Sequence, residues 1–479
     1  MHTYETMIGL EVHVELSTKT KIFCGCPTVF GAKINQQVCP VCMGFPGALP
    51  VLNRQVAEYA LMVATALKCR IPECCLFDRK NYFYPDNPQN YQISQLYAPI
   101  GTNGVLEIET PEGTKEIHIH EMHMEEDAGK LIHDDTCGDT YVDYNRSGVP
   151  LLEIVTEPDF SNGEEVVAFL EKLRLLLQYL GVSDCRMQEG SLRVDVNLSV
   201  RPEGEEKLGV RTEMKNLNSL RSVLRAVEEE QRRQADVLRS GGVVLQETRR
   251  FDETTGTSYA MRLKETTEEY RYFPDPDLRP LWIDAAWRAR VAERQPELRD
   301  EKVMRYQKIF GLPEYDAKIL TSSRQMAKLF EDTTELCGEP KEVSNWLMTE
   351  TMRLLRENGQ DGEDLQLSPE GLAALIQLVK SGKINRTVAK EVFEKMFLEQ
   401  AEPLEYIKEQ GLFMEEDANA LTDAVLAVIK EFPQSVRDYR NGKEKAIGFL
   451  IGQTMKKLGG KANPGKVTEI LRKCLQIDA

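Results

Sequence analysis

The hydrophobic period of the chain changes near Pro296, and this change constrains the fold more than any other feature. Up to about residue 290, apolar and polar residues alternate in short segments bounded by Gly, Pro and Asn, as they do in β-strands. The clearest of these expected strands are 7–16, 116–125, 191–200 and 210–218, with helices expected at 51–68 and 163–180. Beyond Pro296 the apolar residues recur at helical spacing. The sequence therefore predicts an α+β fold, in which a sheet-containing region precedes an all-helical one.

The helical region also carries local start and stop signals. Ser368 and Pro369 form a helix start, an apolar run follows, and Gly382 forms a stop. Further on, the charge reverses: residues 399–431 hold nine acidic and two basic residues, whereas residues 437–473 hold ten basic and three acidic ones. Two interpretations stay open, namely two solvated helix faces of opposite sign, or a terminal module that offers a basic face to RNA phosphates.

Length and composition limit the class of protein. A chain of 479 residues predicts two to four units with separate cores. The formal charge of −17 argues against a general nucleic-acid coat, so any RNA site must be local, and no DNA partner is expected. No apolar run is long enough for a membrane span, and the first residues lack a secretory signal pattern. We therefore expect a cytoplasmic protein with no membrane partner.

Four of the expected strands have one apolar and one strongly polar face. Side chains at i, i+2 and i+4 share a face, which groups Glu11 with His13 and Glu15. The same spacing groups His123 with Glu125, Arg193 with Asp195 and Asn197, and Arg211 with Glu213 and Lys215. The simple explanation is the wet side of an antiparallel sheet. The alternative is a divalent-cation site formed by Glu11, His13, Glu125 and Glu213, with Arg or Lys side chains on phosphate oxygens.

Other common sites are missing from the sequence. It contains neither a GxxxxGK[ST] nor a GxGxxG phosphate loop, so any nucleotide site must be of an uncommon type. No local motif joins a cysteine to a histidine base. If the reaction needs ammonia, we expect another chain to make it.

Cys24, Cys26, Cys39 and Cys42 form the pattern C-x-C-x12-C-x2-C. Two close pairs on either side of a short loop are typical of a structural zinc site in which four thiolates complete a tetrahedron. The alternative is four unrelated buried thiols. The seven other cysteines are expected to be core residues or inert thiols, because a cytoplasmic chain does not use a disulfide framework.

A series of longer motifs resembles one family. The chain contains GLEVHVEL, FDRKNYFYPDNPQNYQISQ, HMEEDAGKLIHD, DYNRSGVPLLEIVTEPD, EGSLRVDVNLSV, MKNLNSLRSV, QETRRFDETTGTSYAMRLKE, EEYRYFPDPDLRPL, SNWLM and NGKEKAIGFLIGQTMKKLGGKANP. Together these motifs resemble the B subunit family of aspartyl/glutamyl-tRNA amidotransferases, and they span nearly the whole chain. The resemblance implies three domains: a cradle-shaped catalytic domain with a mixed or antiparallel sheet at 1–290, a helical domain at 291–400, and a helical tail domain at 401–479 that helps to hold tRNA.

The resemblance also implies an activity and partners. It implies an ATP-dependent carbon–nitrogen ligase with glutamine as the amido donor. In the family, a glutaminase A subunit supplies ammonia, the B subunit phosphorylates the side-chain carboxyl of Glu-tRNA(Gln) or Asp-tRNA(Asn), and a small C subunit clamps the heterotrimer. An archaeal relative specific for Glu-tRNA(Gln) carries an inserted domain for which this chain has no room, which favours the heterotrimeric type.

Site residues follow from the matching motifs. Glu11, His13, Glu125 and Glu213 match positions around the family's magnesium site, and Glu126 and Asp195 are weaker candidates beside it. Glu125 is also expected to be a catalytic residue. Lys80, Arg193 and Lys215 are expected to stabilise the transferred phosphoryl group, or they serve only as ion-pair partners. Tyr82, Tyr84 and Tyr272 are site or channel walls, or core. The cysteine quartet occurs in only part of the family, so zinc would brace a loop.

Three hypotheses remain. The first is the ATP-dependent ligase subunit that the resemblance implies. The second is a non-catalytic subunit that only docks tRNA. The third is a stand-alone metal-dependent hydrolase that uses the His and Glu residues without tRNA.

Overall fold

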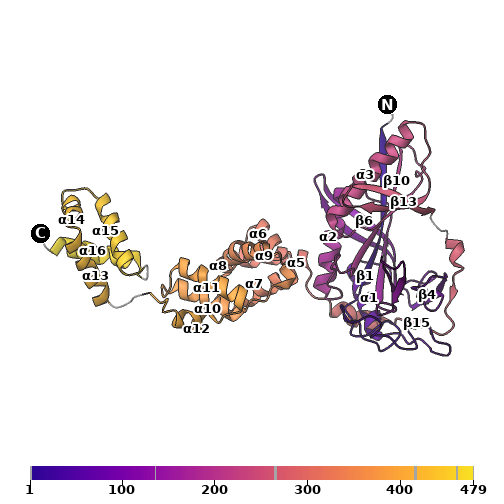
Figure 1. The fold of residues 1–479 in the computed structure, drawn as a ribbon, viewed down its shortest axis with the longest axis horizontal. Coiled ribbons are helices and arrows are strands. Elements are labelled where there is room, and N and C mark those ends of the chain that lie inside the picture. Colours follow the sequence, from indigo (N-terminus) through magenta and orange to yellow (C-terminus); the bar gives the residue numbers. More distant parts are fainter. Residues whose placement is uncertain (1–2, 135, 264–266, 415–417, 460–461, 478–479) are drawn as a thin grey trace. The chain divides into compact units, whose positions relative to one another are not determined.

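The computed structural model describes residues 3–134, 136–263, 267–414, 418–459 and 462–477. The chain divides into two compact units, Met1–Leu298 and Arg299–Ala479. Figure 1 labels many of their helices and strands. The first unit contains the sheets and the second is helical, which confirms the α+β prediction.

The first unit is built on an eight-stranded mixed sheet. In spatial order, its strands are β13 (Thr257–Leu263), β12 (Glu247–Asp252), β11 (Thr212–Lys215), β10 (Leu192–Pro202), β1 (Tyr4–Glu15), β9 (Pro150–Thr156), β6 (Gly113–Glu126) and β5 (Gly101–Thr110). Only β11 and β12 pair in parallel; the other neighbours are antiparallel. The four segments with the clearest strand pattern lie on β1, β6, β10 and β11, so those predictions are confirmed.

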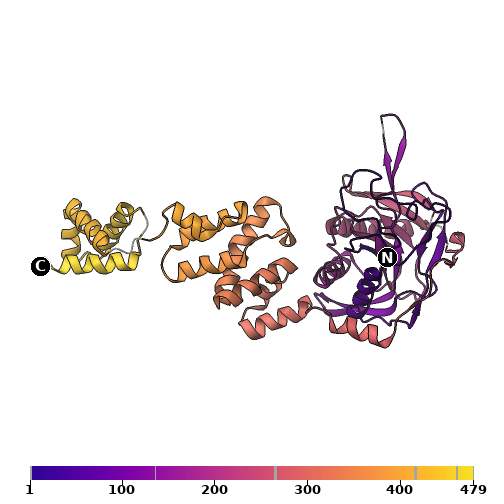
Figure 2. The same cartoon turned by 90° about the horizontal axis from the view of Figure 1, so that it is seen from below.

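Three helices cover the apolar face of this sheet. They are α1 (Arg54–Ala66), α2 (Gly163–Leu180) and α3 (Leu220–Arg239), and their buried side chains share one core with Leu10, Val12 and Val14 of β1. Figure 2 shows them beside the sheet. The Asn162 side chain caps the start of α2, and Gly181 ends it in the left-handed conformation, with a φ of 70°.

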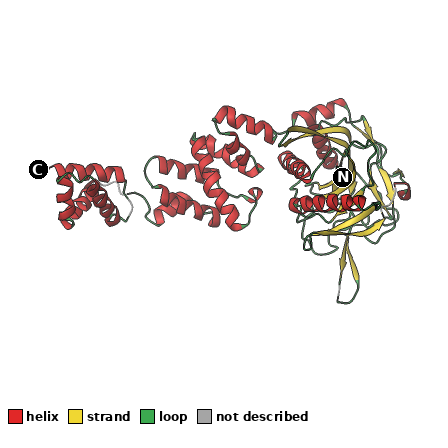
Figure 3. Ribbon diagram, turned by 90° about the horizontal axis from the view of Figure 1, so that it is seen from above, coloured by secondary structure: helices red, strands yellow, loops and turns green. Residues whose placement is uncertain are grey.

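Smaller sheets complete the first unit. A three-stranded sheet has the order β14 (Phe273–Pro274), β3 (Asp78–Asn81) and β4 (Tyr91–Ser94). A second pairs β15 (Leu281–Trp282) with β2 (Cys74–Cys75). The hairpin of β7 (Lys130–His133) and β8 (Thr140–Asp143) projects from this unit in Figure 3. The unit also contains η1 (Thr267–Tyr270) and α4 (Ala285–Glu293), so the succession of helices expected after Pro296 begins slightly earlier, at Ala285.

The second unit contains two separate hydrophobic cores. The first core involves α5 (Arg299–Phe310), α6 (Glu314–Leu320), α7 (Arg324–Cys337), α8 (Pro340–Trp346), η2 (Leu347–Thr351), α9 (Met352–Asn358), α10 (Pro369–Lys380), α11 (Arg386–Glu399) and α12 (Pro403–Glu409), with η3 (Gly362–Asp364) before α10. The second involves α13 (Ala418–Glu431), α14 (Pro433–Arg440), α15 (Lys445–Lys457) and α16 (Pro464–Ile477).

The expected signals around α10 are confirmed, because the Ser368 side chain caps the helix, Pro369 is its first residue, and Gly382 follows its end with a φ of 73°. Residues 415–417 and Lys461, which contribute to the predicted charge reversal, lie outside the described residues. Across the part of the chain that is described, no helix has the length and apolar character that crossing a bilayer requires.

Candidate functional site

Two clusters of metal-ligating side chains lie on the polar face of the large sheet. One contains His13, Glu125 and Glu153, and the other contains Glu11, Asp195 and Glu213; within each, one ligand atom per residue lies within 4.8 Å of the others. Strand register explains the grouping, because Glu11 pairs with Asp195 across β1 and β10, and His13 pairs with Glu153 across β1 and β9. The residues predicted as one magnesium set are thus divided between two clusters.

The His13 cluster centres on the carboxylate of Glu153. His123 Nε2 lies 3.0 Å and His13 Nε2 lies 3.5 Å from Glu153 Oε2. The Glu125 carboxylate is 3.8 Å from both imidazoles. Burial alone would raise the pKa of Glu153, but the charges of His13, His123 and Lys80 outweigh it and hold that pKa well below its ordinary range.

The pKa of His123 is shifted in the opposite direction from that of Glu153. Burial opposes its charged form, yet the carboxylates of Glu153, Glu121 and Glu125 raise its pKa well above the ordinary 6.5. The sequence interpretation did not select Glu153. Its signal is one acidic residue in the mostly apolar strand β9, where the neighbouring Leu152 and Ile154 are buried.

The Glu11 cluster is held by hydrogen bonds from two neutral side chains. Asn197 Nδ2 donates to Glu11 Oε1 at 2.9 Å, and Thr248 Oγ1 donates to Glu213 Oε2 at 2.7 Å. Lys215 forms ion pairs with Asp195 and, at 3.4 Å, with Glu213. Although burial opposes its charge, these carboxylates raise the pKa of Lys215, so it stays a cation at neutral pH. The cluster therefore combines three carboxylates with one ammonium group.

Lys80 reaches the same face from β3. Its Nζ lies 4.8 Å from the centre of the Tyr270 ring, which stands edge-on to Tyr82 and Tyr272 at centroid distances of 6.2 and 6.1 Å. Burial opposes the charge of Lys80, but Glu125 and Glu153 raise its pKa. Burial also raises the pKa of Tyr82 and Tyr272, so these rings are neutral at pH 7. Tyr84 is instead 52% exposed.

Arg193 is engaged by carboxylates. Its Nη1 lies 2.8 Å from Asp127 Oδ2 and 3.6 Å from Glu15 Oε1. Arg146 Nε also reaches Asp127, at 3.3 Å. Burial would raise the pKa of Asp127, but Arg193 and Arg146 hold it below its ordinary value. Asp127 was not selected from the sequence, although it follows the predicted Glu125 and Glu126 directly.

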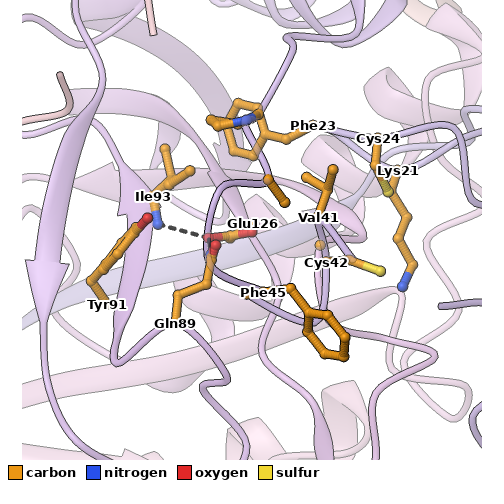
Figure 4. Close-up of a pocket in the computed structure, with 14 residues that line it drawn as sticks. Lys21, Phe23, Cys24, Val41, Cys42, Phe45, Gln89, Tyr91, Ile93 and Glu126 are labelled. Carbon is orange, nitrogen blue, oxygen red and sulfur yellow. Dashed lines mark hydrogen bonds between the residues drawn. The ribbon is translucent and has the colours of Figure 1, made fainter. Parts of the chain in front are cut away.

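Glu126 lies apart from both clusters. Its Oε1 accepts hydrogen bonds from Ile93 N and Gln89 Nε2, each at 2.9 Å. It lines a cavity of about 90 Å³ whose other walls include Phe23, Cys24 and Cys42 (Figure 4). Burial raises the pKa of Glu126 to about 7. A role for Glu126 beside the magnesium site stays a prediction.

The four predicted cysteine ligands converge. Within this quartet, one sulfur per residue lies within 4.8 Å of the others, and the sulfurs of Cys39 and Cys42 are 3.9 Å apart. Four sulfurs at about 2.3 Å from a zinc ion lie about 3.8 Å from one another at the corners of a tetrahedron. The hydrogen bond from Cys24 and the charge of Lys21 contribute to lowering the pKa of Cys42 to about 5. Spacing and donor type therefore fit zinc.

The donor sets on the sheet differ in chemistry. Glu11, Asp195 and Glu213 offer only oxygen atoms, which magnesium prefers. The other cluster adds the His13 imidazole, a donor better suited to transition metals. The carboxylates between β1, β10 and β11 are thus the better match for magnesium beside phosphate.

Family models and individual relatives point to the same family over nearly the whole chain. Residues 6–289 match the GatB/GatE catalytic domain family, and residues 328–475 match the GatB domain family. The chain is 58% identical over 475 residues to the B subunit of the aspartyl/glutamyl-tRNA(Asn/Gln) amidotransferase of Lachnoclostridium phytofermentans, covering 99% of each chain. The protein of the same name from Agathobacter rectalis is also 58% identical over 475 residues, covering 99% of this chain and 100% of the relative. That from Caldicellulosiruptor saccharolyticus is 54% identical over 476 residues, with 99% of each chain covered. The chain therefore belongs to the B subunit family of aspartyl/glutamyl-tRNA(Asn/Gln) amidotransferases.

Proposed function

We propose that this chain is the ATP-dependent activating subunit of a tRNA-dependent amidotransferase. A side-chain carboxylate oxygen of Glu-tRNA(Gln) or Asp-tRNA(Asn) attacks the γ-phosphorus of ATP, and ADP leaves. Ammonia then attacks the acyl carbon, the amide bond forms, and phosphate leaves while the nitrogen loses a proton. The products are Gln-tRNA(Gln) or Asn-tRNA(Asn), so the enzyme is a carbon–nitrogen ligase.

The observation that carries this proposal is the full-length match to relatives of that name, 58% identical over 475 residues. The site supports it, because phosphoryl transfer requires little covalent chemistry from the protein beyond positioning and charge stabilisation. Two carboxylate clusters and the cations Lys80 and Lys215 lie on one face of the sheet or reach it. Such a face can hold both a metal-bound nucleotide and an anionic acceptor.

We assign roles by donor chemistry. Glu11, Asp195 and Glu213 would hold magnesium, with His13 and Glu125 beside the acceptor carboxylate. Magnesium supplies neutralisation of phosphate charge when it is bound. Lys80 and Lys215 orient phosphoryl oxygens through their ammonium groups. Arg193 is already paired with Asp127, and it acts by fixing that carboxylate beside Glu15.

The names of the relatives support a multi-subunit assembly, because each relative is one subunit of an amidotransferase. We propose that a glutaminase A subunit supplies ammonia, that a small C subunit completes a heterotrimer, and that the assembly works in the cytoplasm. We also propose a catalytic domain at 1–290, a helical domain at 291–400 and a tRNA-binding tail at 401–479. Three separate hydrophobic cores support the division into three domains, with Ile407 of α12 in the second core. The cysteine quartet would hold a structural zinc ion.

A non-catalytic tRNA-docking subunit is the second candidate. It differs from the first only in the use of the carboxylate clusters. A stand-alone hydrolase is disfavoured by the match to multi-subunit relatives over both domain families.

The deciding experiment measures ATP hydrolysis by the complex with its A and C partners, with and without Glu-tRNA(Gln) or Asp-tRNA(Asn). Glu125→Ala should abolish tRNA-dependent hydrolysis while tRNA binding is retained, because Glu125 is a buried carboxylate of the His13 cluster, 3.8 Å from both imidazoles. Glu112→Ala, an exposed glutamate at the far end of β6 beyond Gly113, is the matched control. Hydrolysis that survives Glu125→Ala would leave the chain as a docking subunit. The tRNA that elicits hydrolysis identifies the substrate.

A further inference from the structure

Lys21 is a buried lysine in an unusual setting. Its relative exposure is 0%, and its Nζ donates a hydrogen bond to the Tyr144 carbonyl at 3.2 Å. Within the ranges that the structure describes, no carboxylate oxygen lies within the 4.0 Å that defines an ion pair with this nitrogen. A buried ammonium group is costly unless an opposite charge accompanies it. One backbone carbonyl supplies only a dipole, so another source of negative charge is needed.

The groups beside Lys21 are thiols. Lys21, Cys24 and Cys42 line the same cavity, and Figure 4 shows the lysine side chain running past Cys24 toward Cys42. Gly148 marks how closely these groups pack, because a Cβ built on it would lie 3.5 Å from Lys21 Cδ and 3.6 Å from Cys42 Cβ. Glu126 lines the same cavity: its Oε2 lies 3.9 Å from the same Cβ position, and its Oε1 accepts hydrogen bonds from Ile93 and Gln89.

The negative charge of a zinc-bound cysteine site explains how the ammonium group of Lys21 can be buried. Four thiolates around one zinc ion carry a net charge of −2, and this is the counter-charge that the buried Lys21 requires. That charge is itself partly buried, because Cys42 is only 6% exposed. An ammonium group beside the site reduces the net charge to −1. Each buried charge therefore offsets the desolvation cost of the other.

We infer that Lys21 is the counter-ion of a zinc tetrathiolate formed by Cys24, Cys26, Cys39 and Cys42. This inference rests on the zinc site proposed above and adds a residue that binds no metal itself. Groups outside the ligand shell commonly change metal affinity about 10- to 100-fold. The positive charge of Lys21 thus strengthens the retention of zinc by the four cysteines.

The same lysine connects the zinc loop to the polar face of the large sheet. Two hydrogen bonds connect the zinc loop to residues 144–147. Lys21 Nζ donates to the Tyr144 carbonyl, and Ser147 Oγ donates to the Cys42 carbonyl at 3.2 Å. Gly148 N in turn donates to Asp127 O at 2.9 Å, directly after the end of β6. A zinc site whose charge is balanced therefore braces the segment that carries Glu125 and Asp127.

The test compares zinc retention in the full chain. Lys21→Met keeps the length of the side chain and removes its charge, whereas Lys21→Arg keeps the charge. Zinc content is measured by elemental analysis, and zinc loss by the rate of transfer to a chromophoric chelator. Lys21→Met should release zinc about 10- to 100-fold faster than wild type, and Lys21→Arg should stay close to wild type. Lys19→Met, two residues away at an exposed lysine, is the matched control and should leave the rate unchanged.

A charge-restoring variant separates electrostatics from packing. Cys26→His replaces one thiolate by a neutral ligand, so Lys21→Met/Cys26→His regains the wild-type net charge of −1. It should release zinc more slowly than Lys21→Met alone. If Lys21→Met does not fold, recovery of a folded, zinc-containing chain in the double variant supports the inference. No recovery, or a Lys21→Met rate equal to wild type, overturns it.

Failure of the underlying zinc site gives a different result. Wild-type chain without zinc, or Cys39→Ser/Cys42→Ser chain with unchanged zinc content and melting temperature, would refute the zinc site itself. Zinc-containing wild type with an unaffected Lys21→Met variant would refute only the role of the lysine.

Discussion

Oε2 of Glu153 lies 3.0 Å from Nε2 of His123, and the same oxygen lies 3.5 Å from Nε2 of His13. One carboxylate on β9 therefore joins imidazoles on the two neighbouring strands β6 and β1. Because Lys80 also lowers its pKa, Glu153 stays ionised across the working pH range. It orients both imidazoles beside Glu125, and its charge helps to raise the pKa of His123.

Glu153→Gln should lower kcat/KM for tRNA-dependent ATP hydrolysis about 100-fold, the loss typical of removing one preorganised electrostatic group. Glutamine keeps the shape but not the charge that holds His13 and His123. Glu157→Gln is the control, since Glu157 also pairs with a histidine, His120 at 2.7 Å, but its side chain is 44% exposed. Similar kinetics for the two variants would contradict a special role for Glu153.

Arg79 is expected to control the position of Lys80. Its Nε lies 2.7 Å from Asp275 and its Nη2 lies 2.8 Å from Asp277, while the guanidinium lies 4.1 Å from the Tyr91 ring centre. Asn81 on the same strand donates to the Arg271 carbonyl at 2.8 Å. These contacts fasten the segment that carries Tyr270 onto β3.

Arg79→Lys should reduce tRNA-dependent ATP hydrolysis about tenfold, because an ammonium group cannot replace a planar fork that pairs and stacks. Added guanidinium ion should restore part of the activity of Arg79→Ala. Arg54→Lys is the control, because Arg54, on α1, makes the same two kinds of contact away from Lys80. It pairs with Glu58 at 3.2 Å and lies 6.0 Å from the Trp287 ring centre. Loss of activity without rescue would assign Arg79 to folding alone.

Local patterns in the sequence predicted the elements well. The alternation in 7–16 matches β1, and the predicted helix 163–180 has the bounds of α2, because period and caps are encoded by neighbouring residues. Alternation also identified Glu11 and His13 as sharing a polar face. It could not say which strand lies opposite, so the division into two clusters became visible only from the pairing of β1 with β9 and β10.

Glu153 and Asp127 were missed because strand pairing, which brings them into the site, leaves no periodic signal in the sequence. Glu153 lies in a strand whose other residues are mostly apolar, and Asp127 directly follows β6. Their importance comes from contacts with His123 and Arg193, which are 30 and 66 positions away. Tertiary proximity of this kind depends on strand order, which local propensity does not determine.

Glu230 on α3 should make folding stability depend on acid pH. Its exposure is 0%; burial opposes ionisation, but Arg233, Gln234 and Thr212 hydrogen-bond the carboxylate and lower its pKa below the ordinary 4.5. Its contribution to stability is therefore fully present above pH 4.5 and is lost as the pH falls through the lowered pKa. Arg233 binds it through Nε at 2.8 Å and Nη2 at 2.7 Å.

Glu230→Gln should reduce the free energy of unfolding at pH 7 by about 3 kcal/mol, the lower end of the range for breaking a buried pair. The difference between wild type and variant should shrink below pH 4.5, as measured by denaturant unfolding across pH. Asp236→Asn, at an exposed pair with Arg239 on the same helix, is the control. A difference that is constant with pH would show that ionisation of Glu230 is not involved.

The tail should bind tRNA separately from the ATP site. Its helices α13 to α16 form their own core around Val425 and Leu471. Ile407 of α12 instead packs in the preceding core, and Met414 N donates to the Lys383 carbonyl at 2.8 Å. A truncation after Met414 therefore removes the tail core and keeps the preceding core complete.

This truncation should weaken tRNA binding by the complex at least about tenfold, since each lost phosphate contact removes counterion release from the binding free energy. The KM for ATP should change less than about twofold, because the carboxylate clusters lie on the sheet of the first unit. Lys445→Ala/Lys466→Ala, at two exposed tail lysines, should reproduce part of the loss and flatten the salt dependence of tRNA affinity. Equal losses in tRNA and ATP affinity would mean that the tail and the polar face of the sheet bind their substrates as one unit.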